Sequence, residues 1–92
     1  MIGRIRHKGL ERFFLTGDTS GINAQHADRL RLLLTTLNVS TNPDGMNMPG
    51  FRLHILRGDR KGQWAVKVSG NWRLVFEFVG ENATDVDLVD YH

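Results

Sequence analysis

The sequence predicts an α+β domain in which two N-terminal helices pack on one face of an antiparallel β-sheet. Apolar residues recur at helical spacing in the first half and at alternate positions in the second half. Segment 40–50, between the halves, holds both prolines and two glycines and is therefore predicted to be a loop. A chain of 92 residues can bury one hydrophobic core, so residues 1–92 are expected to form a single domain.

The first half supplies the two helices. A helix over 8–15 places Leu10, Phe13 and Phe14 on one face, and Gly17 is expected to cap its end. Residues 2–6 alternate weakly, which indicates a short strand before it. The second helix is expected to follow Asn23, a suitable N-cap. Its solvent side is predicted to hold Gln25, Asp28, Arg29 and Thr36, and its apolar stripe Ala27, Leu30, Leu33, Leu34 and Leu37.

The second half alternates with period two, as is typical of strands with one buried face. The residues predicted for that face are Phe51, Leu53 and Ile55, then Trp64, Val66 and Val68, then Trp72, Leu74, Phe76 and Phe78, and finally Val86 and Leu88. Both tryptophans are therefore expected in the core rather than as platforms for nucleic-acid bases.

Loop lengths predict the strand register. A three-residue hairpin at 69–71 and a four-residue loop at 58–61 keep the apolar residues on one face. The pairs that follow are Val68 with Trp72, Lys67 with Arg73, Arg57 with Gly62, and His54 with Ala65. The opposite, open face would then gather Arg52, His54, Lys67 and Arg73, with Ala65 and Val75 between them.

Charge is distributed unevenly along the chain. Segment 52–73 has six basic residues and the single acid Asp59, whereas the chain from position 74 has five acids and no lysine or arginine. The basic segment indicates a polyanionic partner, although such segments are also common as solvated surface. No apolar run exceeds three residues, so no membrane span or signal peptide is expected, and a cytoplasmic location follows.

The composition argues against a metal site or a disulfide. The chain has no cysteine, and its four histidines, at positions 7, 26, 54 and 92, lack the close spacing of a zinc site. The glycine-flanked loop 58–62 does not have the pattern of a P-loop.

The open face suits metal-free cleavage of RNA. That reaction needs a base for the 2′-OH, an acid for the leaving 5′-oxygen, and cations that hold phosphoryl charge. Neighbouring cations favour the neutral, basic form of His54, and Arg73 and Arg57 are forks suited to phosphate. The anions beside His92 favour its protonated, acidic form. A lone histidine on a sheet is also common as plain surface, and terminal residues are commonly frayed.

Several blocks of the sequence closely resemble the HigB branch of the RelE/ParE toxin superfamily. The three strongest are RLHILRGDRKGQW at 52–64, NWRLVF at 71–76 and DVDLVDYH at 85–92. Segments 5–10 and 19–21 are also similar, so the resemblance spans essentially the whole chain. The resemblance implies a compact α+β fold and a toxin that cleaves mRNA in the ribosomal A site, beside the 16S rRNA, without metal or cofactor. It also implies a helix-turn-helix antitoxin of the HigA type that silences the toxin.

The resemblance assigns roles to individual positions. The matched catalytic group consists of His54, Asp90, Tyr91 and His92, and Arg73 matches the arginine that stabilises the phosphate. Position 57 often holds lysine in the family; because arginine donates protons poorly, Arg57 is assigned to phosphate contact only. The further RNA contacts expected are Arg52, Lys67 and, on ribosomal RNA, Lys8 with the basic loop.

Three other functions are compatible with parts of this pattern. A ParE-like toxin that poisons gyrase by protein contact would not require His54 or the terminal triplet. A weak toxin could bind ribosomes with little cleavage. A plain RNA-binding module is disfavoured because the predicted open face has no aromatic stacking platform.

Overall fold

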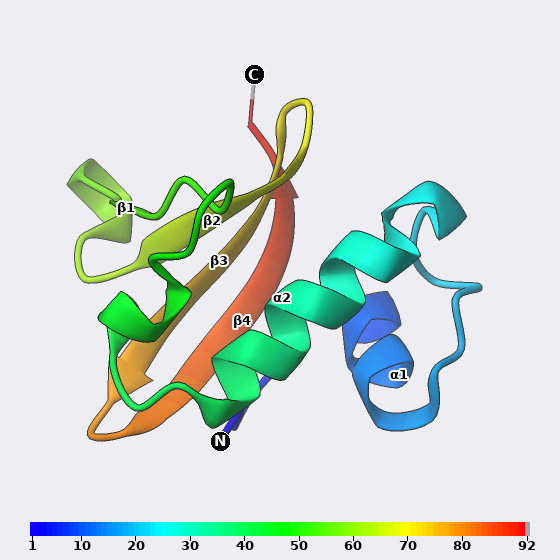
Figure 1. The fold of residues 1–92 in the computed structure, drawn as a ribbon, viewed down its shortest axis with the longest axis horizontal. Coiled ribbons are helices and arrows are strands. Elements are labelled where there is room, and N and C mark those ends of the chain that lie inside the picture. Colours follow the sequence, from blue (N-terminus) through cyan, green and yellow to red (C-terminus); the bar gives the residue numbers. More distant parts are fainter. Residues whose placement is uncertain (92) are drawn as a thin grey trace.

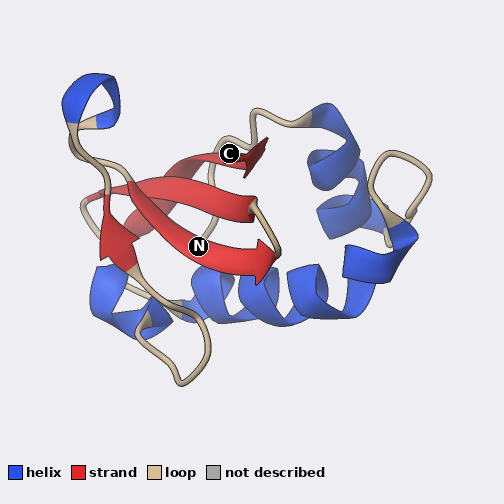
Figure 2. Ribbon diagram, turned by 90° about the horizontal axis from the view of Figure 1, so that it is seen from above, coloured by secondary structure: helices blue, strands red, loops and turns tan. Residues whose placement is uncertain are grey.

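The computed structural model describes residues 1–91 and shows the predicted layers. Four antiparallel strands form one sheet in the order β1-β2-β3-β4. The strands are β1 (His54–Ile55), β2 (Trp64–Ser69), β3 (Trp72–Val79) and β4 (Asn82–Asp90). Helix α2 (Ala27–Val39) crosses one face of the sheet, and α1 (Lys8–Thr16) lies beside α2 on the side away from β1 (Figures 1 and 2). Within residues 1–91, no helix is long and apolar enough to cross a membrane.

The predicted apolar stripes meet in one core. Leu10 and Phe13 of α1 join the buried leucines of α2 and the inward residues of β2, β3 and β4. Trp64 and Trp72 are partly buried against this core, as predicted. Gly17 caps α1 in the left-handed conformation, with φ of 82°, also as predicted. Asn23 does act as an N-cap, but of a short 3-10 turn, η1 (Ala24–His26), that leads into α2.

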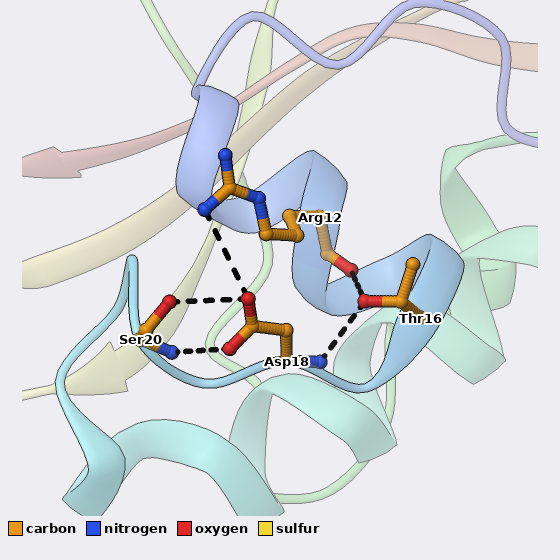
Figure 3. Close-up of polar contacts among 4 residues, drawn as sticks. All are labelled: Arg12, Thr16, Asp18 and Ser20. Atoms are coloured by element: carbon orange, nitrogen blue, oxygen red, sulfur yellow. Dashed lines mark hydrogen bonds and ion pairs between the residues drawn. The ribbon is translucent and has the colours of Figure 1, made fainter.

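The turn after α1 is organised by Asp18 (Figure 3). Its carboxylate accepts hydrogen bonds from the Ser20 backbone N–H (3.0 Å) and hydroxyl (3.1 Å), and Arg12 of α1 lies 3.9 Å away. These contacts lead the chain to Gly21, whose backbone packs directly on Gly9 of α1. A Cβ at Gly9 would lie 2.1 Å from the Gly21 carbonyl oxygen. The turn and the helix therefore touch backbone to backbone.

The N-terminal segment runs parallel to β4. Ile2 and Ile5 form isolated bridges with Ala83 and Val86, so residues 2–6 pair as the predicted strand would but do not form a regular one. On the other side of β4, the register with β3 shifts between Val75 and Glu77. Asp85 there has φ of 49°, a left-handed conformation that aspartate tolerates better than most residues.

The first predicted strand is much shorter than the alternation indicated. Only His54 and Ile55 pair with β2, because Arg52 has φ of 55° and breaks the extended chain. Ile55 was predicted to be buried, yet it is 49% exposed, because it sits on the edge strand. The segment 40–50 contains a 3-10 turn, η2 (Pro43–Met46), and its Met46 is fully buried in the core, which the loop prediction missed.

Two further predictions about β2 and α2 are wrong. Ser69, rather than Val68, lies opposite Trp72, because a bulge at Val68 adds a residue to β2. Arg29 does not face solvent: it is half-buried, and its guanidinium donates to the carbonyl oxygens of Lys67 and Gly50. The pairs Lys67–Arg73 and His54–Ala65 are confirmed.

Candidate active site on the outer face of the sheet

The sheet face opposite α2, here the outer face, carries a small apolar cluster at its centre. Ala65 and Val75 are fully buried, with Leu56 beside them, and Val89 and Tyr91 pack against these three. We call these five residues the outer cluster. The prediction of an open face is therefore wrong at its centre. Leu56 was assigned no role in the sequence analysis, although its position two residues after His54 places it on the same face.

His54 lies at the edge of the outer face, directly opposite Ala65 of the outer cluster. Its side chain is exposed, and its Nδ1 lies 3.0 Å from the Arg52 carbonyl oxygen. A carbonyl oxygen can only accept, so this hydrogen bond requires the proton on Nδ1. In the neutral ring, Nε2 then carries the lone pair that a general base needs.

Lys67 and Arg73 form a cationic pair across β2 and β3, two residues along the strands from the Ala65–Val75 pair. Arg73 Nη1 donates to the carbonyl oxygens of Gly70 (2.7 Å) and Trp72 (3.0 Å), which ties the guanidinium to the hairpin turn. Both bonds use the same nitrogen. The Nε and Nη2 groups can therefore still donate to a phosphate.

The other predicted RNA contacts are more dispersed. Arg57 is exposed and precedes the 3-10 turn η3 (Gly58–Arg60) of the β1–β2 loop, beyond the end of β1. Arg52 is exposed beside His54, which it contacts through its main chain. Lys8 begins α1, on the opposite side of the molecule from β1 (Figure 1). The structure thus does not bring Lys8 together with His54.

Asp90 and Tyr91 lie on opposite faces of the sheet. Tyr91 packs against the outer cluster, and its backbone N–H donates to the Asn71 carbonyl oxygen (2.8 Å) at the tip of the β2–β3 hairpin. Asp90 lies opposite Trp72, and opposite residues share a face, so Asp90 is on the side of α2. His92 lies outside the described residues.

Acidic groups of the sheet lie in β3 and β4. Asp87 ends the row that runs through His54, Ala65 and Val75. A hydrogen bond with Asp85 raises the pKa of Glu77, and burial and the Asp85 charge act in the same direction. A polar pocket of about 510 Å³ adjoins Glu77, and Arg6, Arg60 and Lys61 line it with Asp59 and Gln63. Among residues 1–91, no group of three or more histidine, aspartate or glutamate side chains could hold a metal ion.

Comparison with known proteins identifies the fold and the family. A crystal structure of a YafQ mutant from E. coli matches with a TM-score of 0.60 and 16% identity, covering 98% of this chain and 91% of that chain. The shared architecture, helices on one face of an antiparallel sheet, is that of a RelE-like toxin.

Sequence comparison then identifies the family within the RelE-like toxins. The family model described as "RelE-like toxin of type II toxin-antitoxin system HigB" matches residues 3–92. "Endoribonuclease HigB" from Proteus vulgaris is 39% identical over 92 residues, the full length of both chains. The chain belongs to the HigB family of type II toxins, and this membership implies a cognate antitoxin as a partner.

Proposed function

We propose that this toxin is an endoribonuclease that cleaves mRNA in the A site of the ribosome, next to the 16S rRNA. An antitoxin of the HigA type, with a helix-turn-helix domain, silences it. The relative from Proteus vulgaris carries the name of an endoribonuclease, which supports RNA cleavage. The observation that carries the proposal is His54, whose Nδ1–H bond to Arg52 leaves the exposed Nε2 as a base on a face that also presents Lys67 and Arg73.

In the proposed reaction, His54 Nε2 takes the proton of the 2′-OH, and the 2′-oxygen attacks the adjacent phosphorus. The bond from phosphorus to the 5′-oxygen breaks, and that oxygen takes a proton from an acid in the tail, Tyr91 or His92. Asp90 completes the matched group. Arg73, Arg57, Arg52 and Lys67 hold the phosphate charge, and Lys8 with the loop 58–62 contacts rRNA. The products are a 2′,3′-cyclic phosphate and a 5′-hydroxyl, and no step requires a metal.

The test is cleavage by purified protein on programmed ribosomes, with mRNA 5′ ends mapped by primer extension. We expect breaks at the A-site codon that persist in EDTA, need ribosomes and leave 2′,3′-cyclic phosphate ends. His54→Ala should abolish them, whereas the adjacent, exposed Ile55→Ala should cleave normally. Full cleavage by His54→Ala would overturn the assigned chemistry. Intact mRNA with the unaltered protein would overturn the function. Gyrase supercoiling and ribosome-binding assays would then test the two alternative toxin functions.

A further inference from the structure

We infer that Arg29 of α2 is a positioning residue that holds the His54 imidazole with its proton on Nδ1. The structural part of this inference depends only on contacts among the described residues. Its catalytic consequence rests on the proposed function, in which His54 Nε2 is the base.

Arg29 joins three separate segments of the chain. Its Nε and Nη2 lie 3.2 and 2.9 Å from the carbonyl oxygen of Lys67 in β2, and Nη2 lies 2.8 Å from the carbonyl oxygen of Gly50. The guanidinium carbon sits 5.0 Å from the centroid of the Phe51 ring, a cation–π distance. One side chain of α2 therefore fastens the segment that precedes β1 to the bulged end of β2.

The fastened segment leads directly to His54. The backbone N–H of Lys67 donates to the Phe51 carbonyl oxygen (2.8 Å), and the Lys67 carbonyl oxygen accepts from Arg29. Both main-chain polar groups of Lys67 therefore help to hold this segment against β2. The next residue, Arg52, has φ of 55°, a left-handed conformation that a non-glycine residue keeps only when its surroundings hold it. That conformation aims the Arg52 carbonyl oxygen at His54 Nδ1, 3.0 Å away.

Loss of the Arg29 guanidinium would release this arrangement. The carbonyl oxygens of Lys67 and Gly50 would lose their donor, and Arg52 would relax toward the extended conformation that its side chain favours. Rotation of the Arg52 peptide would then remove the acceptor from His54 Nδ1. An unconstrained neutral histidine prefers its proton on Nε2, which would convert the proposed base into a donor.

The first readout is the position of the proton on the His54 ring, by nitrogen NMR of the purified, isotope-labelled protein above the titration range of histidine. We expect Nδ1 protonated and Nε2 bare in the unaltered protein, and a shift to the Nε2–H form in Arg29→Ala. Single-turnover cleavage on ribosomes should fall by roughly 10- to 100-fold with little change in KM, as expected for a misplaced catalytic group.

Arg31→Ala is the matched control. Arg31 is also on α2 and also stacks on an aromatic ring, 5.5 Å from the centroid of Phe13, but its hydrogen bond goes to Asp28 of the same helix. This variant should change neither the His54 tautomer nor the cleavage rate. Arg29→Lys keeps the charge but loses the planar guanidinium that bridges the two carbonyl groups and stacks on Phe51, so it should shift the tautomer in the same direction. It serves as the test if Arg29→Ala does not fold by circular dichroism.

An Nδ1–H tautomer retained in folded Arg29→Ala or Arg29→Lys would overturn the inference, and so would the same tautomer shift in Arg31→Ala. A shifted tautomer with an unchanged cleavage rate would overturn its catalytic part. If the unaltered protein cleaves no mRNA, the proposed function fails, yet the tautomer comparison still decides whether Arg29 positions His54.

Discussion

At the scale of single residues, the outer face depends on main-chain geometry that side-chain patterns do not record. Arg52 was predicted as an RNA contact through its guanidinium, but its carbonyl oxygen is the group that meets His54. Position 52 thus contributes both an exposed side chain and a main-chain acceptor. A substitution at position 52 therefore tests two things at once, whereas substitutions at Arg29 test the main-chain arrangement alone.

Arg73 gives the sharpest prediction about a single side chain. Arg73→Ala should slow cleavage by roughly 10²–10³ if the guanidinium stabilises developing phosphoryl charge. It should also lose about 1 kcal/mol of stability, because two turn carbonyl oxygens lose their donor. Single-turnover kinetics and urea unfolding measure the two effects separately. An unchanged rate together with reduced stability would leave Arg73 with a structural role only.

At the scale of elements, α1 is held by a backbone contact and by the turn that follows it. Gly9→Ala should destabilise the protein by about 1–3 kcal/mol, because the new Cβ meets the Gly21 backbone and neither side can yield cheaply. This loss exceeds the gain of up to ~1 kcal/mol that alanine brings in helix propensity. Denaturant unfolding measures the change.

Gly3→Ala is the control for Gly9→Ala, since a Cβ at Gly3 would make only ordinary contacts, the nearest at 3.5 Å to Thr84 Oγ1. It should leave stability nearly unchanged. Equal stability of Gly9→Ala and the unaltered protein would mean that α1 and the following turn can separate at little cost.

The turn after α1 should make stability depend on pH. Hydrogen bonds from the Ser20 backbone and hydroxyl lower the pKa of Asp18, with Arg12 adding a smaller effect in the same direction. A lowered pKa in the folded state means that the unfolded chain binds the proton more tightly. The stabilisation by the Asp18 carboxylate is therefore complete well above pH 3.8, the ordinary pKa of an aspartate, and is lost as the pH falls through the lowered pKa of the folded state.

The measurement is thermal unfolding of the unaltered protein and Asp18→Asn from neutral pH to about pH 2. The unaltered protein should be more stable at neutral pH, and the difference should shrink as the pH falls. A constant difference across this range would assign the effect to the shape of the turn rather than to the carboxylate charge.

At the level of the whole molecule, charged groups lie at both ends of the sheet. Lys67 and Arg73 lie toward the β2–β3 turn, whereas Glu77 and Asp85 lie toward the opposite end of β3 and β4. Arg6, Arg60 and Lys61 line the pocket beside Glu77, so this end of the sheet carries cations as well. Glu77 and Asp85 are neighbouring like charges, and Arg4 lies 3.7 Å from the Asp85 carboxylate.

That pair gives a second pH prediction, with the opposite sign. Because the hydrogen bond with Asp85 raises the pKa of Glu77, the folded state binds this proton more tightly than the unfolded chain. The free energy of unfolding should therefore fall as the pH rises from 4.5, the ordinary pKa of a glutamate, through the raised pKa of Glu77. Glu77→Gln keeps a donor to Asp85 at every pH and should be the more stable protein at neutral pH.

Thermal unfolding between pH 4 and 7 checks this, with Glu81→Gln in the exposed β3–β4 turn as the control. The control should follow the unaltered protein. A Glu77→Gln variant that is less stable than the unaltered protein at neutral pH would mean that Glu77 has an attractive partner there.

Sequence patterns alone predict the two helices, the inward faces of the strands and the opposition of His54 with Ala65. These features follow from hydrophobic periodicity and turn chemistry, which act between residues close along the chain. The register predictions that used loop length succeeded for the Lys67–Arg73 pair, and failed at Val68 because a bulge is not visible in an alternating pattern.

How those elements build the site depends on contacts between segments that are distant along the chain. Arg29 was predicted to face solvent because it is charged and lies outside the apolar stripe, yet its long side chain reaches carbonyl oxygens 21 and 38 residues away. Leu56 was left out because the outer face was predicted to be open, whereas Leu56, Ala65 and Val75 form a buried cluster there. Asp90 and Tyr91 are adjacent in sequence but fall on opposite faces, since alternate residues of an extended chain point to opposite sides of a sheet. Long-range hydrogen bonds and backbone strain depend on which segments meet in space, and local sequence patterns carry no information about that.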